Sequence, residues 1–168
     1  MARVLIRHLA HLATCDDQRH EWNDASILVV DGVIAAVGPT AEAAPEADEV
    51  LDGRHLLAVP GMVNTHHHMF QCITRAVPAA QNAELFGWLQ TLYPIWQRLT
   101  PAMVGSAAHV AMAELLMSGC TTSSDHLYLY PNGVRLEDTI EAAHTLGLRF
   151  VATRGSMSVG QSQGGLPP

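Results

Sequence analysis

The sequence has no long apolar run and no recognisable leader. None of its apolar stretches reaches the roughly 18 residues that a transmembrane helix requires. A signal peptide would begin with a charged segment followed by a clean apolar one, and neither is present in the opening MARVLIRHLAHLATCDDQ. We therefore expect a cytoplasmic protein with no membrane partner.

Basic residues and cysteines are also scarce. Lys and Arg number 9 against 16 Asp and Glu, which gives a net charge of −7. An acidic chain without a basic stripe is a poor binder of nucleic acid, so we expect no nucleic-acid partner. The odd number and wide spacing of Cys15, Cys72 and Cys120 indicate reduced thiols. A disulfide framework or a cysteine-based zinc site would need a different pattern.

Apolar residues and histidine are plentiful by comparison. The 48% apolar and 15% charged composition is typical of a globular chain with a core and excludes a disordered one. Ten histidines outnumber the nine Lys and Arg. Histidine is the commonest metal ligand, so clusters of histidine mark candidate sites. His109 and His144 fall in expected helices and are interpreted as structural.

The first 59 residues show the pattern of short strands. Asp31-Gly32 separates two β-branched runs, which is the strongest short signal for a hairpin because both turn residues tolerate positive φ. A Pro/Ala/acid loop is expected over 38–48 and a turn over 51–53. Strands are expected over 2–7, 26–30, 33–37 and 56–59.

From residue 60 onward, strands and helices alternate. The Thr100-Pro101 pair marks a helix start, and Gly119 and Gly147 mark helix ends. Pro94 is expected to kink or split the helix around it. We expect strands over 62–65, 120–125 and 148–153, helices over 84–98, 100–118 and 136–146, and irregular structure over 69–82.

Such alternation predicts parallel βαβ units, and parallel sheets place functional residues at the carboxyl ends of their strands. The polar residues expected at those ends are His66 and His68, then Asp125 and His126, then Arg154. Residues 60–168 have room for about three βα units of roughly 30–40 residues. A (β/α)8 barrel needs roughly 250 residues. We therefore expect the chain to be the opening portion of a larger protein.

The triplet His66-His67-His68 is the candidate metal centre. Side chains alternate along a strand, so His66 and His68 point to one side and His67 to the other. Two imidazoles on one side can reach one metal ion, but zinc sites need three or four ligands, so others must come from elsewhere. From the spacing alone, an ordinary polar turn is an equal alternative.

The residues 60–68, PGMVNTHHH, resemble the Pro-Gly-Leu-Val-Asp/Asn-Thr-His-X-His signature of the amidohydrolase superfamily. The hairpin VDGVIAAVG is similar to that superfamily's small N-terminal β domain. Gln71, Trp88 and Asp125-His126 narrow the resemblance to the cytosine deaminase, guanine deaminase and triazine hydrolase branch. The strings TRAVPAAQNAELFGWLQTLYPIW and GCTTSSDHLYLYPNG are most similar to 8-oxoguanine deaminases.

The resemblance implies a fold class and a reaction. The fold would be α/β, with the first three strands of a metal-dependent (β/α)8 TIM-like barrel over 60–168. Part of a small β-sandwich domain would precede it over 1–59. One divalent metal, zinc or alternatively iron, would be bound by His66 and His68. The metal would activate water to release ammonia from a purine, converting 8-oxoguanine to urate.

The same resemblance implies further ligands and an acid/base pair on later strands, beyond Pro168, so the chain alone is expected to be inactive. It also implies that Gln71 bonds the purine ring, with a loop glutamine facing water as the alternative. Trp88 would form a pocket wall or simply pack in a helix core. Arg154 would face a substrate oxygen or form a salt bridge. Asp125 and His126 would shape a loop or line the pocket.

Several alternatives remain open. Guanine or another aminated heterocycle such as an s-triazine is the alternative substrate, and a metal-sequestering, interacting or inactive fragment is the non-catalytic alternative. The unrelated zinc cytidine deaminases use H-X-E with a later P-C-X-X-C, and neither pattern is present. The expected partners are a small heterocycle and further copies of the chain in a homo-oligomer.

Overall fold

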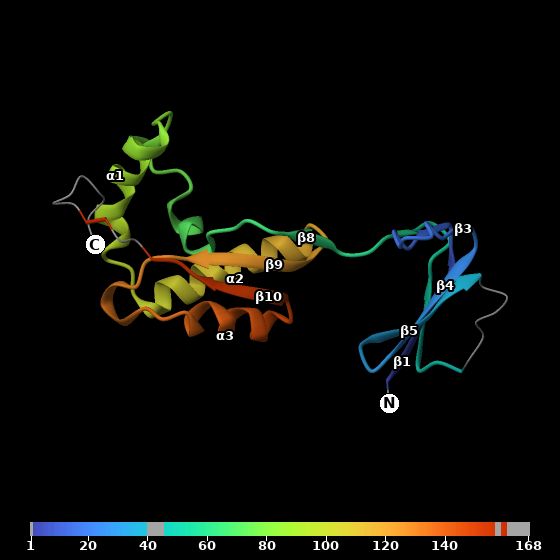
Figure 1. Ribbon diagram of the computed structural model, residues 1–168. Coiled ribbons are helices and arrows are strands. Elements are labelled where there is room, and N and C mark those ends of the chain that lie inside the picture. Colours follow the sequence, from blue (N-terminus) through green and yellow to red (C-terminus); the bar gives the residue numbers. More distant parts are fainter. Residues whose placement is uncertain (1, 40–45, 157–158, 161–168) are drawn as a thin grey trace. The chain divides into compact units, whose positions relative to one another are not determined.

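The protein has a mixed α/β fold made of two compact units, Met1–Pro60 and Gly61–Pro168 (Figure 1). The structure, a computed structural model, describes residues 2–39, 46–156 and 159–160. Most of the loop expected over 38–48 therefore lies outside the described residues. Among the residues that are described, no helix combines the length and apolarity needed to cross a membrane.

The N-terminal unit contains two small sheets. The four-stranded sheet has the order β5-β4-β1-β6, and the three-stranded sheet has the order β3-β2-β7. Leu9, Leu12 and Ala25 form its buried core. The strands are β1 (Arg3–Leu9), β2 (His11–Ala13), β3 (Glu21–Trp22), β4 (Ala25–Val30), β5 (Val33–Pro39), β6 (Glu49–Asp52) and β7 (Leu57–Ala58).

The hairpin predicted at Asp31-Gly32 is confirmed. Strands β4 and β5 pair antiparallel across it, and both turn residues have positive φ, 49° and 79°. The turn predicted at 51–53 is wrong in part, because Leu51 and Asp52 belong to β6, which pairs parallel with β1. That pairing is made with residues more than forty positions away. A local composition signal cannot report it.

The C-terminal unit is built on a parallel three-stranded sheet with the order β10-β9-β8. The predicted alternation of strands and helices is confirmed. Helices α2 and α3 pack against each other and along β9 and β10 (Figure 1). The elements are β8 (Met62–Asn64), η2 (Met69–Thr74), η3 (Pro78–Ala80), α1 (Leu85–Trp96), α2 (Pro101–Met117), β9 (Cys120–Leu127), η4 (Pro131–Gly133), α3 (Glu137–Leu146) and β10 (Arg149–Arg154).

The helix signals in this unit are mostly confirmed. Thr100 is the N-cap of α2, and its hydroxyl accepts from the N–H of Met103 at 3.4 Å. Gly147 ends α3 in the left-handed conformation. Helix α1 runs unsplit through Pro94, contrary to the expectation of a split. The proline lies in the last turn, so the one helical bond it removes is that to the carbonyl of Gln90, and only two residues of α1 follow it.

The core of the C-terminal unit lies in two buried clusters. One joins η2, α1 and β9 around Phe70, Trp96 and Leu127, and the other joins η2, α2 and α3 around Met69 and Ala108. Met69 and Phe70 are consecutive, and burying each side chain contributes about 1.5–3 kcal/mol. The chain directly after His68 is therefore anchored in both clusters, although 69–82 was expected to be irregular.

The sheet of this unit has two open edges and an apolar face that the described residues leave exposed. Met62, Val63 and Val151 are each more than half exposed, and β8 and β10 are the edge strands. Such edges pair readily with other chains. We expect residues 1–168, produced alone, to self-associate in sedimentation velocity. A monomer with a cooperative melting transition would contradict this.

Candidate active site

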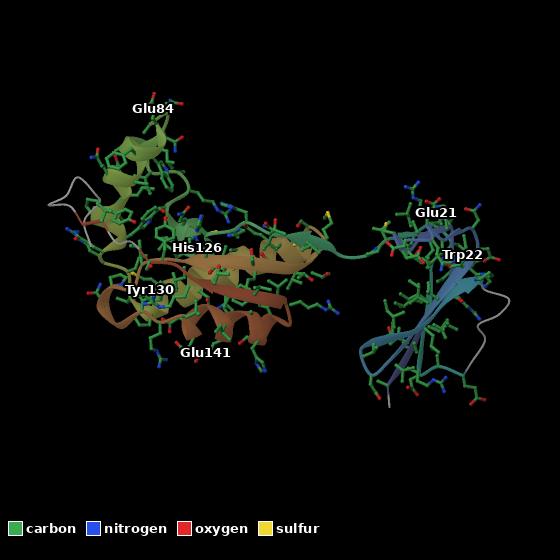
Figure 2. The ribbon with its side chains drawn as sticks, in the orientation of Figure 1. Glu21, Trp22, Glu84, His126, Tyr130 and Glu141 are labelled. Carbon is green, nitrogen blue, oxygen red and sulfur yellow. The ribbon has the colours of Figure 1, made fainter. Side chains whose placement is uncertain are left out.

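The parallel sheet brings three chain segments together at the carboxyl ends of its strands. Strand β8 ends at Asn64, so His66 and His68 lie in the segment that follows it. His126 is the last residue but one of β9, and it is paired in register with Thr153 near the end of β10. His126 is labelled in Figure 2, at the end of the sheet nearest to η2. Residues 58 positions apart are thus neighbours here.

His66 and His68 approach each other closely. Their ring centroids are 5.1 Å apart in an edge-to-face arrangement. The N–H of His66 donates to Asn64 Oδ1 at 3.0 Å, which fixes the backbone where it leaves the strand. Both side chains line the same hollow at the strand ends. The two rings therefore border one common space.

The ring of His68 is held as a metal-binding imidazole usually is. Its Nδ1 lies 2.8 Å from the backbone carbonyl of His126 and can only donate to that oxygen. The other nitrogen, Nε2, then carries the free lone pair that a metal requires. This donor set fits a divalent metal. Among the described residues no three His, Cys, Asp or Glu side chains form a complete site, so the pair is a partial one.

His67 has different surroundings. Its ring is half-buried, and its Nδ1 is buried with no hydrogen-bond partner in the described part of the chain. Burial, followed by the nearby charge of Arg75, lowers the pKa of His67 and favours the neutral ring. Its carbonyl accepts from the N–H of His126 at 2.9 Å. His67 does not line the hollow that contains His66, His68 and Tyr128, but it lines a neighbouring one together with His66 and His68.

Asp125 lies behind the histidines, on the face of β9 that packs into the core. It is 1% exposed, and its Oδ1 accepts from the N–H of Met69 at 2.9 Å. Its Oδ2 is buried without a hydrogen-bond partner among the described residues. Burial is the main cause that raises the pKa of this carboxyl. Asp125 therefore faces the backbone of the η2 segment rather than the hollow.

The hollow at the strand ends has a volume of about 470 Å³, within the range of small-molecule sites. Most of its wall is aromatic or aliphatic, and its polar groups are few. The residues that line it are His66, His68, Gln71, Leu85, Trp88, Leu89, Tyr93, His126, Tyr128 and Ser156. Such a slot suits a flat, mostly apolar ring with a few hydrogen-bonding groups.

Gln71 is fixed at the edge of this hollow. Its Nε2 donates to the hydroxyl of Tyr128 at 2.8 Å. Burial raises the pKa of Tyr128 to about 12, so its hydroxyl stays protonated near neutral pH. The Tyr128 ring also makes edge contacts with His68 and Phe70, both at 5.2 Å between centroids. With one end of its amide engaged, Gln71 has its carbonyl oxygen left for a ligand.

Trp88 and Arg154 have separate positions. Trp88 lines the hollow and also contacts Trp96 edge-to-face at 5.3 Å, so packing and wall formation coexist. Arg154 ends β10 and lies outside the residues that line the hollow. Its guanidinium stacks over the ring of Tyr130, 4.7 Å from the centroid. Figure 2 labels Tyr130 beyond the sheet end.

Tyr128 is the main lining residue that the sequence reasoning missed. The second strand was expected to end at Asp125, whereas β9 continues to Leu127. Residues two apart on an extended chain share a side, so the spacing of His126 and Tyr128 was the available signal.

Comparison with known proteins agrees with this arrangement. Residues 57–164, more than half of the chain, match the family model described as the amidohydrolase family. The chain belongs to the amidohydrolase family. The matched residues include both histidines, Gln71, Trp88 and the whole parallel sheet.

Individual amidohydrolase relatives are similar over nearly the whole chain. The 8-oxoguanine deaminase of Pseudomonas aeruginosa is 46% identical over 84% of this chain and 32% of its own length. A triazine hydrolase structure from Arthrobacter aurescens matches 99% of this chain and 38% of that chain, with a TM-score of 0.88 and 34% identity. The atrazine chlorohydrolase of Arthrobacter aurescens TC1, complexed with zinc, matches 97% of this chain and 38% of that chain, with a TM-score of 0.84 and 32% identity. This chain thus spans about a third of the length of its relatives.

Proposed function

We propose that this chain forms the first part of the active site of a metal-dependent aminohydrolase that releases ammonia from a purine, with 8-oxoguanine as the substrate and urate as the product. One observation carries the proposal. Two neighbouring histidines, His66 and His68, line the same hollow as the fixed amide of Gln71, and the ring of His68 is held with its Nε2 available to a metal. The 46% identity to an 8-oxoguanine deaminase supports the choice of substrate.

The proposal includes a wider architecture. Strands β8, β9 and β10 with their helices are the first three βα units of a (β/α)8 barrel, since barrel active sites lie at the carboxyl ends of the strands. The sheets of the N-terminal unit are part of a small β-sandwich. The acid, the base and the remaining metal ligands then belong to later strands of the complete protein.

His66 and His68 would hold the metal through one nitrogen each. A divalent metal, when bound, makes water acidic enough to act as a nucleophile near neutral pH. Zinc is the proposed metal, supported by the zinc complex of the related atrazine chlorohydrolase, and iron is the alternative. The fixed tautomer of His68 supplies a ligand without further rearrangement.

The lining residues would hold and orient the purine. Trp88 and Tyr128 bound a slot for a flat ring, and their apolar surfaces exclude water from it. The Gln71 carbonyl accepts from an N–H on the pyrimidine edge. That contact turns the carbon bearing the amino group toward the two histidines, where water attacks and ammonia leaves.

Ammonia release from a panel of heterocycles tests the substrate. We expect the complete gene product that contains this chain to deaminate 8-oxoguanine faster than guanine, cytosine or an amino-substituted s-triazine. Compared with guanine, 8-oxoguanine adds an N7–H donor and an O8 acceptor. If guanine binds a site built for those atoms, buried polar groups of the site stay unpaired. Such a mismatch can lower kcat/KM by orders of magnitude. A triazine or cytosine as the best substrate would overturn the purine assignment.

An s-triazine is the second candidate substrate. The observation that favours it is the TM-score of 0.88 to a triazine hydrolase across almost the entire chain. The same hollow would accept a triazine ring, which is also flat and carries amino substituents. The same panel separates the two candidates.

Removing the amide of Gln71 should weaken catalysis without releasing metal. We expect Gln71→Ala to lower kcat/KM by about tenfold, the cost of one lost hydrogen bond in a dry site, at unchanged metal content. Tyr128→Phe frees the amide to rotate and should cost about threefold to tenfold.

The double variant distinguishes an indirect role of Tyr128 from a direct one. If Tyr128 acts through Gln71, the double variant has the kcat/KM of Gln71→Ala alone. Additive losses would mean that the Tyr128 hydroxyl contacts the substrate itself. Steady-state kinetics and metal analysis on the same preparations supply both measurements.

A further inference from the structure

Two consecutive residues of β9 hold three consecutive residues of the histidine segment. The N–H of His126 donates to the carbonyl of His67 at 2.9 Å, and the carbonyl of His126 accepts from Nδ1 of His68 at 2.8 Å. The carboxylate of Asp125 accepts from the N–H of Met69 at 2.9 Å. The backbone on both flanks of His68 and the ring itself are thus each fixed by one bond.

The three bonds differ in how strongly they depend on the amino acid at each position. Any residue at position 126 supplies the backbone N–H and carbonyl, whereas the bond to Met69 exists only because position 125 has a side-chain acceptor. This acceptor is almost completely buried, and its second oxygen has no partner among the described residues. Burying a carboxylate in this way is costly. The hydrogen bond that holds the backbone at the metal-binding segment gives a reason to keep a buried carboxylate here despite its cost.

We infer that Asp125 is a positioning residue that sets the metal affinity of the site by anchoring the backbone directly after His68. The inference rests on the proposed function, in which His66 and His68 are the ligands. Without the bond to the N–H of Met69, the backbone that directly follows His68, at the start of η2, is no longer fixed. The imidazole then samples orientations in which Nε2 and the ring of His66 no longer converge. Partners one step removed from a metal typically contribute 10–100-fold to its affinity.

The test is the zinc dissociation constant of the complete gene product, measured by competition with a chromophoric chelator. Asp125→Ala removes the acceptor and should weaken zinc binding by at least about tenfold. Asp125→Asn keeps an acceptor oxygen and should stay within about threefold of the unmodified protein. The asparagine also brings a buried NH2, so its metal-free form should melt at a lower temperature. Lower stability with retained zinc affinity is the result that separates positioning from a general structural role.

Asp138→Ala is the matched control. The Asp138 carboxylate also accepts from a backbone N–H, that of Arg135 at 2.8 Å, but at the start of α3. It should lower the melting temperature and leave zinc affinity unchanged. Unchanged affinity in Asp125→Ala would overturn the inference, as would an Asp125→Asn variant that binds zinc as weakly as Asp125→Ala. If Asp125→Ala does not fold, Asp125→Asn alone decides, because tenfold weaker binding there would mean that charge, not anchoring, sets the affinity.

The outcome is distinguishable from failure of the proposed function. If alanine at His66 and at His68 leaves zinc binding intact, the metal site is wrong and the anchor has no ligand to position. If those variants lose zinc and Asp125→Ala does not, only the role of Asp125 is wrong.

Discussion

Alanine in place of His66 or His68 is expected to remove the bound metal and almost all deaminase activity. The two rings lie 5.1 Å apart between centroids, and the Nδ1 of His68 is already committed to the carbonyl of His126, which leaves its Nε2 for a metal. A catalytic zinc lowers the pKa of the water bound to it from far above neutral pH to near it, so the loss should exceed about a thousandfold. Metal analysis and ammonia release on the complete gene product measure the two effects.

His67→Ala is the matched control from the same triplet. The ring of His67 is half-buried and is not among the residues that line the hollow with Tyr128, although it borders a neighbouring hollow shared with His66 and His68. Its hydrogen bond to β9 is made by its backbone carbonyl, which alanine retains. We expect most of the metal and activity to remain. Equal metal loss in all three variants would contradict the assignment of His66 and His68, rather than His67, as the ligands. Retention of metal in all three would remove the basis for a metal centre here.

Gly155→Ala is expected to displace two residues that line the hollow, His126 and Tyr128. A Cβ on Gly155 would lie 2.4 Å from Nε2 of His126 and 2.5 Å from Cβ of Tyr128. Glycine is required here for space, at the position directly after β10. Overpacking of this kind costs about 1–3 kcal/mol. We expect a lower melting temperature together with a lower kcat/KM, because both displaced residues line the hollow.

Two further variants make this prediction specific. Gly87→Ala is the control, since a Cβ at Gly87 meets no atom within 4 Å and alanine favours a helix. It should be neutral or slightly stabilising. Truncating His126 in the Gly155→Ala background should not restore stability, because the Cβ of Tyr128 is fixed to its backbone. A Gly155→Ala protein with unchanged stability and kinetics would show that the sheet end yields more easily than these distances indicate.

Local chemistry made part of this fold predictable. Asp31-Gly32, Thr100-Pro101 and Gly147 act through their own backbone preferences, and each has the predicted role in the structure. The strands of the parallel sheet were also predictable in outline, because strand and helix patterns alternate. Position 140 shows the limit: Leu136, Ile140 and Ala143 are spaced as one face of a helix, yet Ile140 is 41% exposed. Thr139 and Ala142 are buried there instead, because α2 packs against that side.

The candidate site was predictable only where its residues are close in sequence. The spacing of His66 and His68 predicts that both side chains lie on the same side of the chain, and the structure brings their rings together. The bonds from β9 to the histidine segment join residues 56 to 59 positions apart, and no local pattern encodes them. Asp125 could equally have shaped a loop or lined a pocket when seen in sequence alone. The role of Asp125 depends on which residues of neighbouring chain segments lie opposite it. That register is a property of the folded sheet.

The alternating burial along β9 has a consequence for how this family can vary in length. Ser123, Asp125 and Leu127 face the core, and His126 faces the opposite side. Because the side-chain period is two, inserting or deleting one residue in the strand exchanges the two sets. The Met69 anchor and the wall of the hollow would be lost together. Natural gains and losses of residues should therefore be tolerated in the connections on either side of β9, and this strand should keep its length while its individual side chains diverge.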